Sequence, residues 1–236
     1  MMKTDLIKYE LNNKIFTGYL AIPGEGKYPC VLIAHTWAGR DSFVEEKARI
    51  LAESGYAAFA IDMYGEGRIG TSNEENASMM QPLLDDRDEL ARRVSSAMDS
   101  LKHHDNIDMN KVSIMGYCFG GLVALDLART ASELRGAVSF HGFLAGPENS
   151  NNDSINAKIL AFHGELDPMV DQNQIDSFTK EMNQKKADWQ LHTFGDAMHA
   201  FTNPDANDPD FGTVYSQTAD RRSWKIYMDF LEEIYK

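Results

Sequence analysis

Cysteine is scarce in this chain, because only Cys30 and Cys118 occur among its 236 residues. Two cysteines are too few for the disulfide framework of a small secreted protein, and they favour a reducing, cytoplasmic location. Proline is also rare, with 7 residues, while 43% of the chain is hydrophobic. This composition is that of an ordinary globular protein and excludes collagen-like and disordered chains.

Long apolar runs are absent as well. No segment reaches the roughly 18 consecutive apolar residues that a transmembrane helix needs. Residues 1–16 also lack the apolar core and the small-residue cleavage site of a secretory signal peptide. The sequence therefore predicts a cytoplasmic protein that makes no use of a membrane.

Positive charge is in deficit, since 23 basic residues face 36 acidic ones and the formal net charge is −13. A protein with this charge repels phosphate backbones and anionic lipid surfaces. We therefore expect a small molecule as the partner, and neither nucleic acid nor a membrane.

Repeats, low-complexity tracts and charged linkers are absent too, so nothing in the sequence divides the chain. Its length fits one large domain, and we expect a single domain over residues 1–236. Sequence alone leaves open whether this domain is a monomer or a small homo-oligomer.

What the sequence does contain is an alternation of strand and helix patterns. The first 22 residues alternate with a period of two on either side of Asn12-Asn13, which predicts an opening β-hairpin. Runs typical of buried parallel strands then occupy residues 30–34, 56–61, 112–115, 137–140, 159–162 and 189–194. Helical spacing is found at residues 43–53, 120–131, 174–183 and about 218–235. The pattern predicts an α/β fold with a doubly wound, mostly parallel sheet.

A further helical stripe and three irregular stretches complete this picture. Leu83, Leu90, Val94, Met98 and Leu101 share one stripe, which predicts a long helix. Residues 65–82, 146–156 and 203–212 read as irregular loops, each beyond a strand's carboxyl end, where open α/β sheets bind ligands. Residues 68–82 are either a mobile lid over the pocket or a plain surface loop.

The most informative motif is Gly116-Tyr117-Cys118-Phe119-Gly120-Gly121, which stands between a predicted strand and a predicted helix. This is the pattern of a nucleophile elbow, with cysteine where serine is common. The strained turn exposes the nucleophile, the glycines avoid clashes, and the helix directs its first amides at the reaction centre. The alternative is a buried packing cysteine in a glycine-rich turn, which is our interpretation for Cys30 in its apolar run.

A cysteine nucleophile needs a base and an acid, which follow it in this order in such architectures. Asp167 follows a buried strand and His199 follows the last strand, so the two match these places. Helix capping or an Asp-Pro turn is the alternative for Asp167. The less favoured acids are Glu165 and Asp196.

The other histidines divide by position. His103, His104 and His192 read as structural, since two end a solvated helix and one lies within a strand. His35, His141 and His163 each end a predicted strand. They either line the pocket or serve as hydrogen-bonded support, and the second interpretation is preferred.

Together these motifs resemble the dienelactone hydrolase family of the α/β-hydrolase superfamily. The match runs over nearly the whole chain and includes His35-Thr36-Trp37-Ala38-Gly39, Ile61-Asp62-Met63-Tyr64-Gly65, the Cys118 elbow, Gly164-Glu165-Leu166-Asp167 and His199-Ala200-Phe201-Thr202-Asn203-Pro204. The resemblance implies Cys118 as nucleophile, His199 as base and Asp167 as orienting acid. It also implies that the backbone amides of Phe119 and Trp37 form the oxyanion hole.

The sequence departs from this family at two points. Thr36 stands where members that open dienelactone often have a glutamate, and residues 200–203 lack their substrate-binding arginine. A preference for anionic lactones is therefore not predicted. Four other arginines could take the place of the missing substrate-binding arginine, namely Arg40, Arg68, Arg221 and Arg222. The simpler interpretation of each is a solvated charge on the protein surface. The substrate-binding candidates are Thr36, Tyr64, Arg68, His141 and Phe201.

These observations predict a cysteine-dependent hydrolase of carboxylic esters or lactones that forms a thioester acyl-enzyme. Neither metal-ligand spacing nor a dinucleotide-binding loop is present, so we expect no metal and no cofactor. Two alternatives stay open: another α/β-hydrolase activity such as thioesterase or peptidase, and a non-catalytic ligand-binding or thiol-redox protein.

Overall fold

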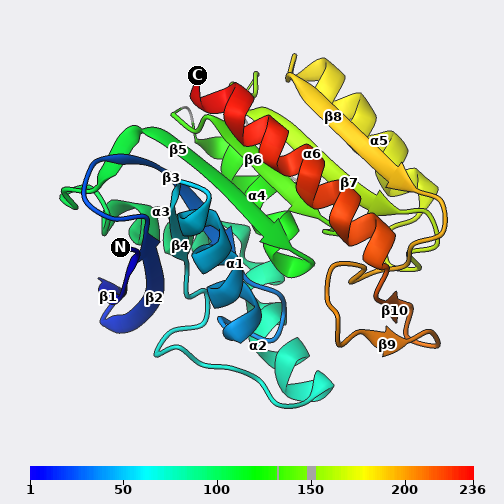
Figure 1. The fold of residues 1–236 in the computed structure, drawn as a ribbon. Coiled ribbons are helices and arrows are strands. Elements are labelled where there is room, and N and C mark those ends of the chain that lie inside the picture. The colour runs from blue at the N-terminus through cyan, green and yellow to red at the C-terminus, as the bar shows by residue number, and fades with distance from the viewer. Residues whose placement is uncertain (132, 148–152) are drawn as a thin grey trace. The chain divides into compact units, whose positions relative to one another are not determined.

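The computed structural model describes residues 1–131, 133–147 and 153–236 (Figure 1). By its internal contacts the chain divides into two compact units, Met1–Met115 and Gly116–Lys236, which we describe one at a time. The single domain expected from the sequence stays a prediction. Within the predicted irregular stretch 146–156, residues 148–152 lie outside the described part.

The first unit opens with the predicted β-hairpin, which is confirmed. Strands β1 (Lys3–Leu11) and β2 (Lys14–Ile22) pair antiparallel, with Leu11 opposite Lys14. Asn12 and Asn13 form the turn with φ values of 53° and 61°. Two consecutive positive φ values belong to a tight hairpin turn, and asparagine tolerates them better than most residues do.

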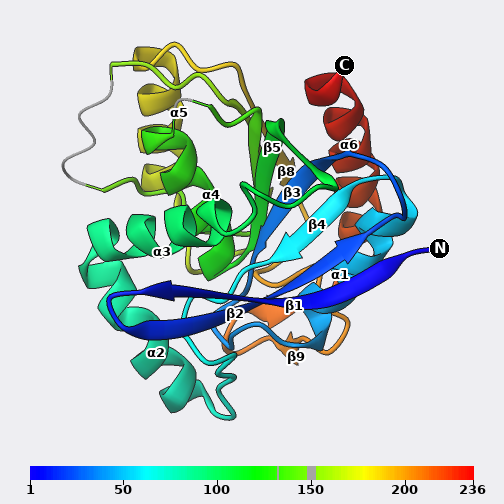
Figure 2. The same cartoon turned by 90° about the vertical axis from the view of Figure 1, so that its left-hand side faces the viewer.

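The hairpin continues into the buried strands of this unit. β2 pairs antiparallel with β4 (Ala57–Ala60), and β4 pairs parallel with β3 (Tyr28–Ala34). Helix α1 (Ser42–Glu53), capped by the Asp41 side chain, packs on β4. Helix α3 lies on the opposite side of these strands (Figure 2). Strand β5 (Ile107–Tyr117) then leads to the second unit.

The long helix predicted from the stripe at Leu83 to Leu101 is wrong, because the structure has two helices there. α2 (Asn73–Asp85) and α3 (Arg87–Asp99) meet at Asp86, whose side chain caps α3 by accepting from the Glu89 amide at 2.8 Å. Residues 73–82 are therefore helical, which also corrects the irregular loop expected over 65–82.

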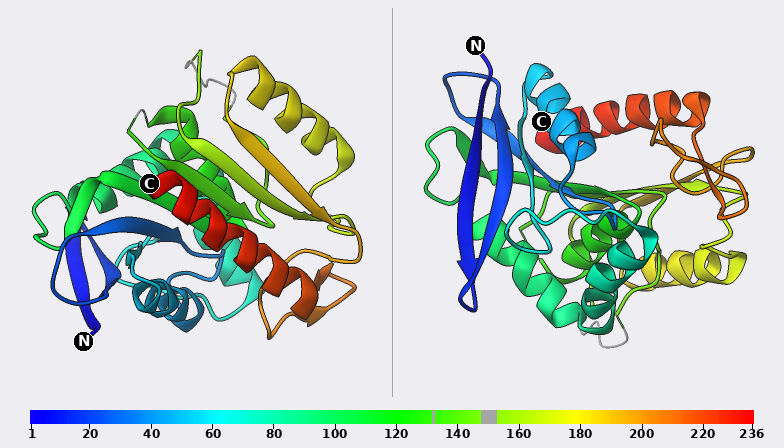
Figure 3. Two further views of the ribbon diagram at one scale, coloured as in Figure 1. Left: turned by 45° about the horizontal axis from the view of Figure 1, so that its top comes forward. Right: turned by 90° about the horizontal axis from the view of Figure 1, so that it is seen from below.

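The second unit has the parallel strands and flanking helices of a doubly wound sheet, as predicted. β6 (Gly136–Phe140), β7 (Lys158–Gly164) and β8 (Trp189–Phe194) are parallel neighbours in that order. α4 (Phe119–Thr130) and α5 (Gln172–Gln184) cover one face, and α6 (Gln217–Tyr235) covers the other (Figure 3). The short strands β9 (Asn207–Asp208) and β10 (Thr213–Val214) lie between β8 and α6.

A buried ion-pair network joins two helices of this unit. Arg129 on α4 is 1% exposed and binds Asp126 at 3.1 Å, Glu181 on α5 at 2.7 Å and the Leu144 carbonyl at 2.8 Å. Each charged end is thus hydrogen-bonded, as a buried charge requires. The network fixes α5 and the segment after β6 to α4.

Candidate active site

Cys118 occupies a sharp turn between the end of β5 and the start of α4. Its backbone has φ 54° and ψ −116°, a conformation that costs a non-glycine residue of order 1–3 kcal/mol. The Cys118 amide donates to the Phe140 carbonyl at 3.0 Å, and its own carbonyl accepts from Gly121 at 2.9 Å. The side chain is partly exposed, whereas Cys30 is buried. This is the geometry of a nucleophile elbow.

The glycines on either side are required by close packing. A Cβ at position 116 would lie 2.0 Å from the Gly120 carbonyl oxygen. At position 121 it would lie 2.5 Å from Ser139 Oγ and 2.8 Å from the Gly142 Cα. Both glycines therefore let the chain turn sharply around Cys118, as the motif predicts.

Asp167 and His199 meet although 32 residues separate them. His199 Nδ1 lies 2.7 Å from Asp167 Oδ2, and both side chains are buried. The other carboxylate oxygen, Oδ1, accepts from the Met169 amide at 2.8 Å, which fixes the carboxylate in the turn. Glu165 and Asp196, the alternative acids, are exposed. The geometry therefore favours Asp167 as the partner of His199.

His199 also interacts with Cys118. Burial alone would lower the pKa of His199, but the negative charge of Cys118 and the hydrogen bond to Asp167 raise it to about 10. At neutral pH the ring is then an imidazolium beside the side chains of Asp167 and Cys118. In general, an imidazolium next to a cysteine favours the thiolate, which is the nucleophilic form.

The loop after β8 holds His199 by its backbone. The His199 amide donates to the Gly212 carbonyl at 2.9 Å, and the His199 carbonyl accepts from the Val214 amide at 3.1 Å. Gly212 has φ +82°, and a Cβ there would lie 2.2 Å from Pro168 Cγ, next to Asp167. The predicted irregular stretch 203–212 therefore connects the acid and the histidine.

Two further predicted residues of the second unit surround His199. The His141 ring lies 5.1 Å from the His199 ring and 5.0 Å from the Phe201 ring, edge to face in both cases. His141 Nε2 is hydrogen-bonded to Thr202 Oγ1 at 2.8 Å. Phe201 is fully buried between Phe194 and His141, so it supports the ring of His141.

In the first unit, the predicted oxyanion residue Trp37 lies in a loop held by hydrogen bonds. The Tyr64 hydroxyl donates to the Trp37 carbonyl at 2.9 Å, and Thr36 Oγ1 accepts from the Ala38 amide at 3.3 Å. His35 Nδ1 lies 2.6 Å from the Thr36 carbonyl oxygen, and its Nε2 accepts from the Met63 amide at 3.1 Å. His35 is therefore hydrogen-bonded support, as preferred from the sequence.

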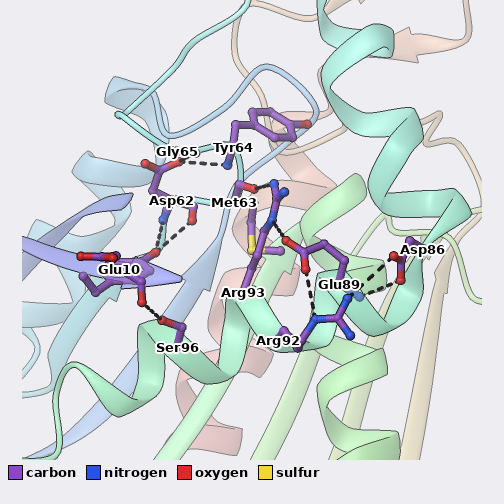
Figure 4. A network of polar contacts seen from close by, with 11 residues as sticks. Glu10, Asp62, Met63, Tyr64, Gly65, Asp86, Glu89, Arg92, Arg93 and Ser96 are labelled. Carbon is purple, nitrogen blue, oxygen red and sulfur yellow. Dashed lines mark hydrogen bonds and ion pairs between the residues drawn. The ribbon is translucent and has the colours of Figure 1, made fainter. Parts of the chain in front are cut away.

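Asp62 organises the neighbouring turn (Figure 4). Its carboxylate accepts from the amides of Tyr64, Gly65 and Gly67 at 2.8 to 3.0 Å. Arg93 donates to the Met63 carbonyl at 2.7 Å and ties the turn to α3. Asp62 belongs to the matched motif, but its position at a strand end did not reveal this role.

The predicted replacement cations are engaged or exposed. Arg40 is buried, donates to the Thr17 carbonyl at 2.8 Å and pairs with Glu45. Arg68 pairs with Glu75 at 3.0 Å on α2. Arg221 and Arg222 are exposed on α6.

No cluster of three or more His, Cys, Asp or Glu side chains in residues 1–131, 133–147 and 153–236 could hold a metal ion. No helix in those ranges is both long and apolar enough to span a membrane.

Comparison with known proteins identifies the family. The model of the family described as "Dienelactone hydrolase family" matches residues 16–235. The chain belongs to the dienelactone hydrolase family. It is also 29% identical, over 96% of its length and 93% of the relative's, to a Bradyrhizobium protein named "Probable 2-oxo-3-(5-oxofuran-2-ylidene)propanoate lactonase". The resemblance seen in the sequence is thereby confirmed.

Solved structures support the same assignment. A dienelactone hydrolase-like promiscuous phosphotriesterase from metagenomic libraries superposes with a TM-score of 0.93 at 32% identity, covering 99% of this chain and 98% of its own. A dienelactone hydrolase from Anabaena variabilis shares the fold with a TM-score of 0.64 at 23% identity, over 86% of this chain and 90% of its own. The predicted α/β-hydrolase fold class is confirmed, and the chain is a member of a hydrolase family.

Proposed function

We propose that this protein is a cysteine-dependent hydrolase of carboxylic esters or lactones, with Cys118, His199 and Asp167 as its catalytic triad. The observation that carries the proposal is the buried His199, whose Nδ1 binds Asp167 at 2.7 Å and whose charge is stabilised by Cys118. A packing cysteine needs no such partners, whereas a nucleophile needs both a base and an orienting acid.

The chemistry follows from these groups. The Cys118 thiolate attacks the carbonyl carbon, and the carbonyl electron pair moves onto oxygen. Collapse of this intermediate expels the alkoxide, which takes the proton from the His199 imidazolium and leaves a thioester on Cys118. His199, now neutral, accepts a proton from water, whose oxygen attacks the thioester and releases the acid. Release of the acid expels the Cys118 thiolate, and His199 already carries the proton that it took from water.

The oxyanion donors in this proposal are the backbone amides of Phe119 and Trp37, as family membership implies. Phe119 is the first residue of α4, so its amide belongs to the positive end of the helix dipole. Contacts of substrate with Thr36, Tyr64 and Arg68 are proposed on the same basis, whereas His141 and Phe201 are 2% and 0% exposed and are proposed to support the site from within. Because Arg40 and Arg68 pair with glutamates, we favour neutral esters and lactones over anionic ones.

Hydrolysis of a short aryl ester from pH 5 to 9 tests the proposal. Cys118→Ala should lose at least about a hundredfold in kcat/KM, because the covalent route is removed. Cys30→Ala is the matched control, since it removes the other thiol from the core and should keep the activity of the folded enzyme. Rapid quenching followed by mass spectrometry should find the acyl group on Cys118. Equal activity of wild type and Cys118→Ala would refute the nucleophile and favour the ligand-binding or thiol-redox interpretation.

The substrate class needs its own assay. Rates on matched oxygen esters, lactones, thioesters and anilides should be highest for the first two. The lactonase name of the Bradyrhizobium relative supports this order. A thioester or an amide turned over faster than both would assign the thioesterase or peptidase alternative instead.

Phosphotriester hydrolysis is a second candidate activity. Its support is the metagenomic structure named as a promiscuous phosphotriesterase, with 32% identity over 99% of this chain. Release of a phenol from a diethyl aryl phosphate would test it, with Cys118→Ala as the comparison. A rate unchanged in that variant would remove Cys118 from this reaction.

We further propose a cytoplasmic enzyme that acts as a monomer or small homo-oligomer, without nucleic acid or membrane partners. The presence of only two cysteines in the sequence and a net charge of −13 support this. Light scattering after size exclusion would give the oligomeric state, and sedimentation with anionic vesicles would reveal membrane binding.

A further inference from the structure

His141 and Thr202 form a buried hydrogen-bonded pair beside His199. Their side chains are 2% and 1% exposed, and His141 Nε2 lies 2.8 Å from Thr202 Oγ1. Thr202 stands three positions after His199 in the same loop, while His141 directly follows β6. The bond therefore ties the histidine loop to the end of a different strand.

The ring of His141 also contacts His199 directly. The two ring centroids are 5.1 Å apart with an interplanar angle of 67°, an edge-to-face arrangement that favours aromatic pairs. A ring in this position restricts rotation of the His199 imidazole from the side. The Asp167 carboxylate restricts it from Nδ1.

The backbone places His141 there at a cost. Its φ is +41°, in the left-handed region, and its amide donates to the Phe162 carbonyl at 2.8 Å. The next residue, Gly142, is so tightly packed that a Cβ there would lie 2.7 Å from the Gly121 Cα of α4. Strain of this kind persists only where the surrounding structure requires it, and it clusters at functional sites.

The charge state of His141 also suits its position beside His199. Burial and the positive charge of His199 hold the pKa of His141 well below its usual value, so His141 is a neutral ring beside an imidazolium. The titratable groups that face His199 are Cys118, Asp167, His141 and His163, and burial lowers the pKa of His163 as well. Neither neighbouring histidine adds a charge that would repel the imidazolium.

We propose that His141, through its ring contact and its bond to Thr202, is a positioning residue that holds the His199 imidazole in line with Cys118. This deepens the proposed function and rests on it, because it assumes that His199 serves the cysteine. His141 Nδ1 has no hydrogen-bond partner among the described residues. The bond to Thr202 is then the polar contact that fixes the plane of this ring.

Thr202→Val tests the hydrogen bond with little change in shape. A net hydrogen bond contributes about 0.5–1.5 kcal/mol, so we expect kcat to fall roughly two- to tenfold while KM stays within about twofold. The second readout is the rate at which iodoacetamide alkylates Cys118 as a function of pH. Because a misplaced imidazolium stabilises the thiolate less, the midpoint of this profile should move to higher pH. Thr202→Ser keeps the hydroxyl and should rescue both readouts, while the exposed Thr218→Val is the control.

A double variant separates positioning from stability. His141→Phe keeps an aromatic ring but leaves the Thr202 hydroxyl unpaired, whereas His141→Phe with Thr202→Val removes both polar partners. Removing both partners of a buried bond costs less stability than removing one. The double variant should therefore regain thermal stability over Thr202→Val without regaining kcat or the alkylation midpoint. Recovery of all three together would assign the pair a purely structural role.

The proposal fails if Thr202→Val and His141→Phe, both folded by circular dichroism, keep the wild-type kcat and alkylation midpoint. Failure of the proposed function gives a different result. In that case Cys118→Ala retains hydrolysis, or mass spectrometry finds the alkylated residue elsewhere, whatever happens at Thr202.

Discussion

Replacement of Asp167 by Asn is the perturbation with the most direct consequence for His199. The carboxylate is buried, lies 2.7 Å from Nδ1 and is fixed by the Met169 amide, so Asn can take its place without a change in volume. A hydrogen bond between charged groups contributes about 1.5–3 kcal/mol. Since 1.36 kcal/mol corresponds to one pKa unit, the pKa of His199 should fall by about one to two units.

The direction of the pH effect follows from the state of the ring. With a pKa of about 10, His199 keeps its proton well above neutral pH, so it can still protonate a leaving alkoxide there. In Asp167→Asn the imidazolium is lost at lower pH. The basic limb of the kcat/KM profile should move down by about one to two pH units.

The assay compares two substrates, because they depend differently on the imidazolium. An alkyl ester expels a strongly basic alkoxide and needs the proton, so Asp167→Asn should cost it about a hundredfold or more at neutral pH. An aryl ester expels a weakly basic phenolate and should lose less. Asp196→Asn is the matched control, since Asp196 is exposed in the same region of the chain.

Two results would refute this reasoning. One is a basic limb that stays where the wild type has it in folded Asp167→Asn. The other is an equal loss in Asp196→Asn, which would mean that removal of any nearby negative charge has the same effect.

Three further predictions concern stability. Burial lowers the pKa of His35 to about 4, so on acidification the unfolded chain takes up this proton at a higher pH than the folded chain does. The free energy of unfolding should therefore fall by about 3 kcal/mol as pH drops from 6.5 to 4. Urea unfolding of the wild type and of His35→Asn measures this. Arg129→Met leaves the Glu181 carboxylate without its cation and should lower the unfolding free energy by about 3–5 kcal/mol, with partial recovery in the double variant with Glu181→Gln. Gly116→Ala puts a methyl group 2.0 Å from a backbone oxygen and should lower Tm sharply. Gly195→Ala is the control and should leave Tm unchanged, because a Cβ there has nothing within 4 Å. Equal Tm values for the two variants would contradict the packing argument.

The sequence predicts best those features that depend on neighbouring residues. The hairpin turn at Asn12 and Asn13 and the elbow at Cys118 both need special backbone angles, and the residues that tolerate or require them stand together in the chain. The order of nucleophile, acid and histidine along the strands likewise predicts that Asp167 and His199 meet. These predictions needed no knowledge of the loops.

The break between α2 and α3 was missed for a physical reason. The apolar stripe runs on through Leu83 and Leu90, because a gap of seven residues keeps the same face whether or not the helix is interrupted. The signal that could have located the break is a capping box. Asp86 and Glu89 have this sequence pattern at the start of α3, where Asp86 accepts from the Glu89 amide, and Ser72 and Glu75 have it at the start of α2.

The support of the site depends on contacts that no local pattern encodes. Thr202 and Asp62 look like ordinary loop residues in the sequence, yet one bonds His141 and the other gathers three backbone amides of its turn. Their partners are determined by how loops from different strands approach one another.

The charge of His199 is the clearest case of a property that arises only in the fold. Its residue type predicts a pKa near 6.5, and burial alone would lower that value further. The rise to about 10 comes from Cys118 and Asp167 together, which the ends of different strands bring to His199. Composition and motif can therefore propose which residues form the triad. Whether the cysteine is charged at neutral pH depends on distances that only the folded chain provides, which is why pH profiles are the decisive measurements for this protein.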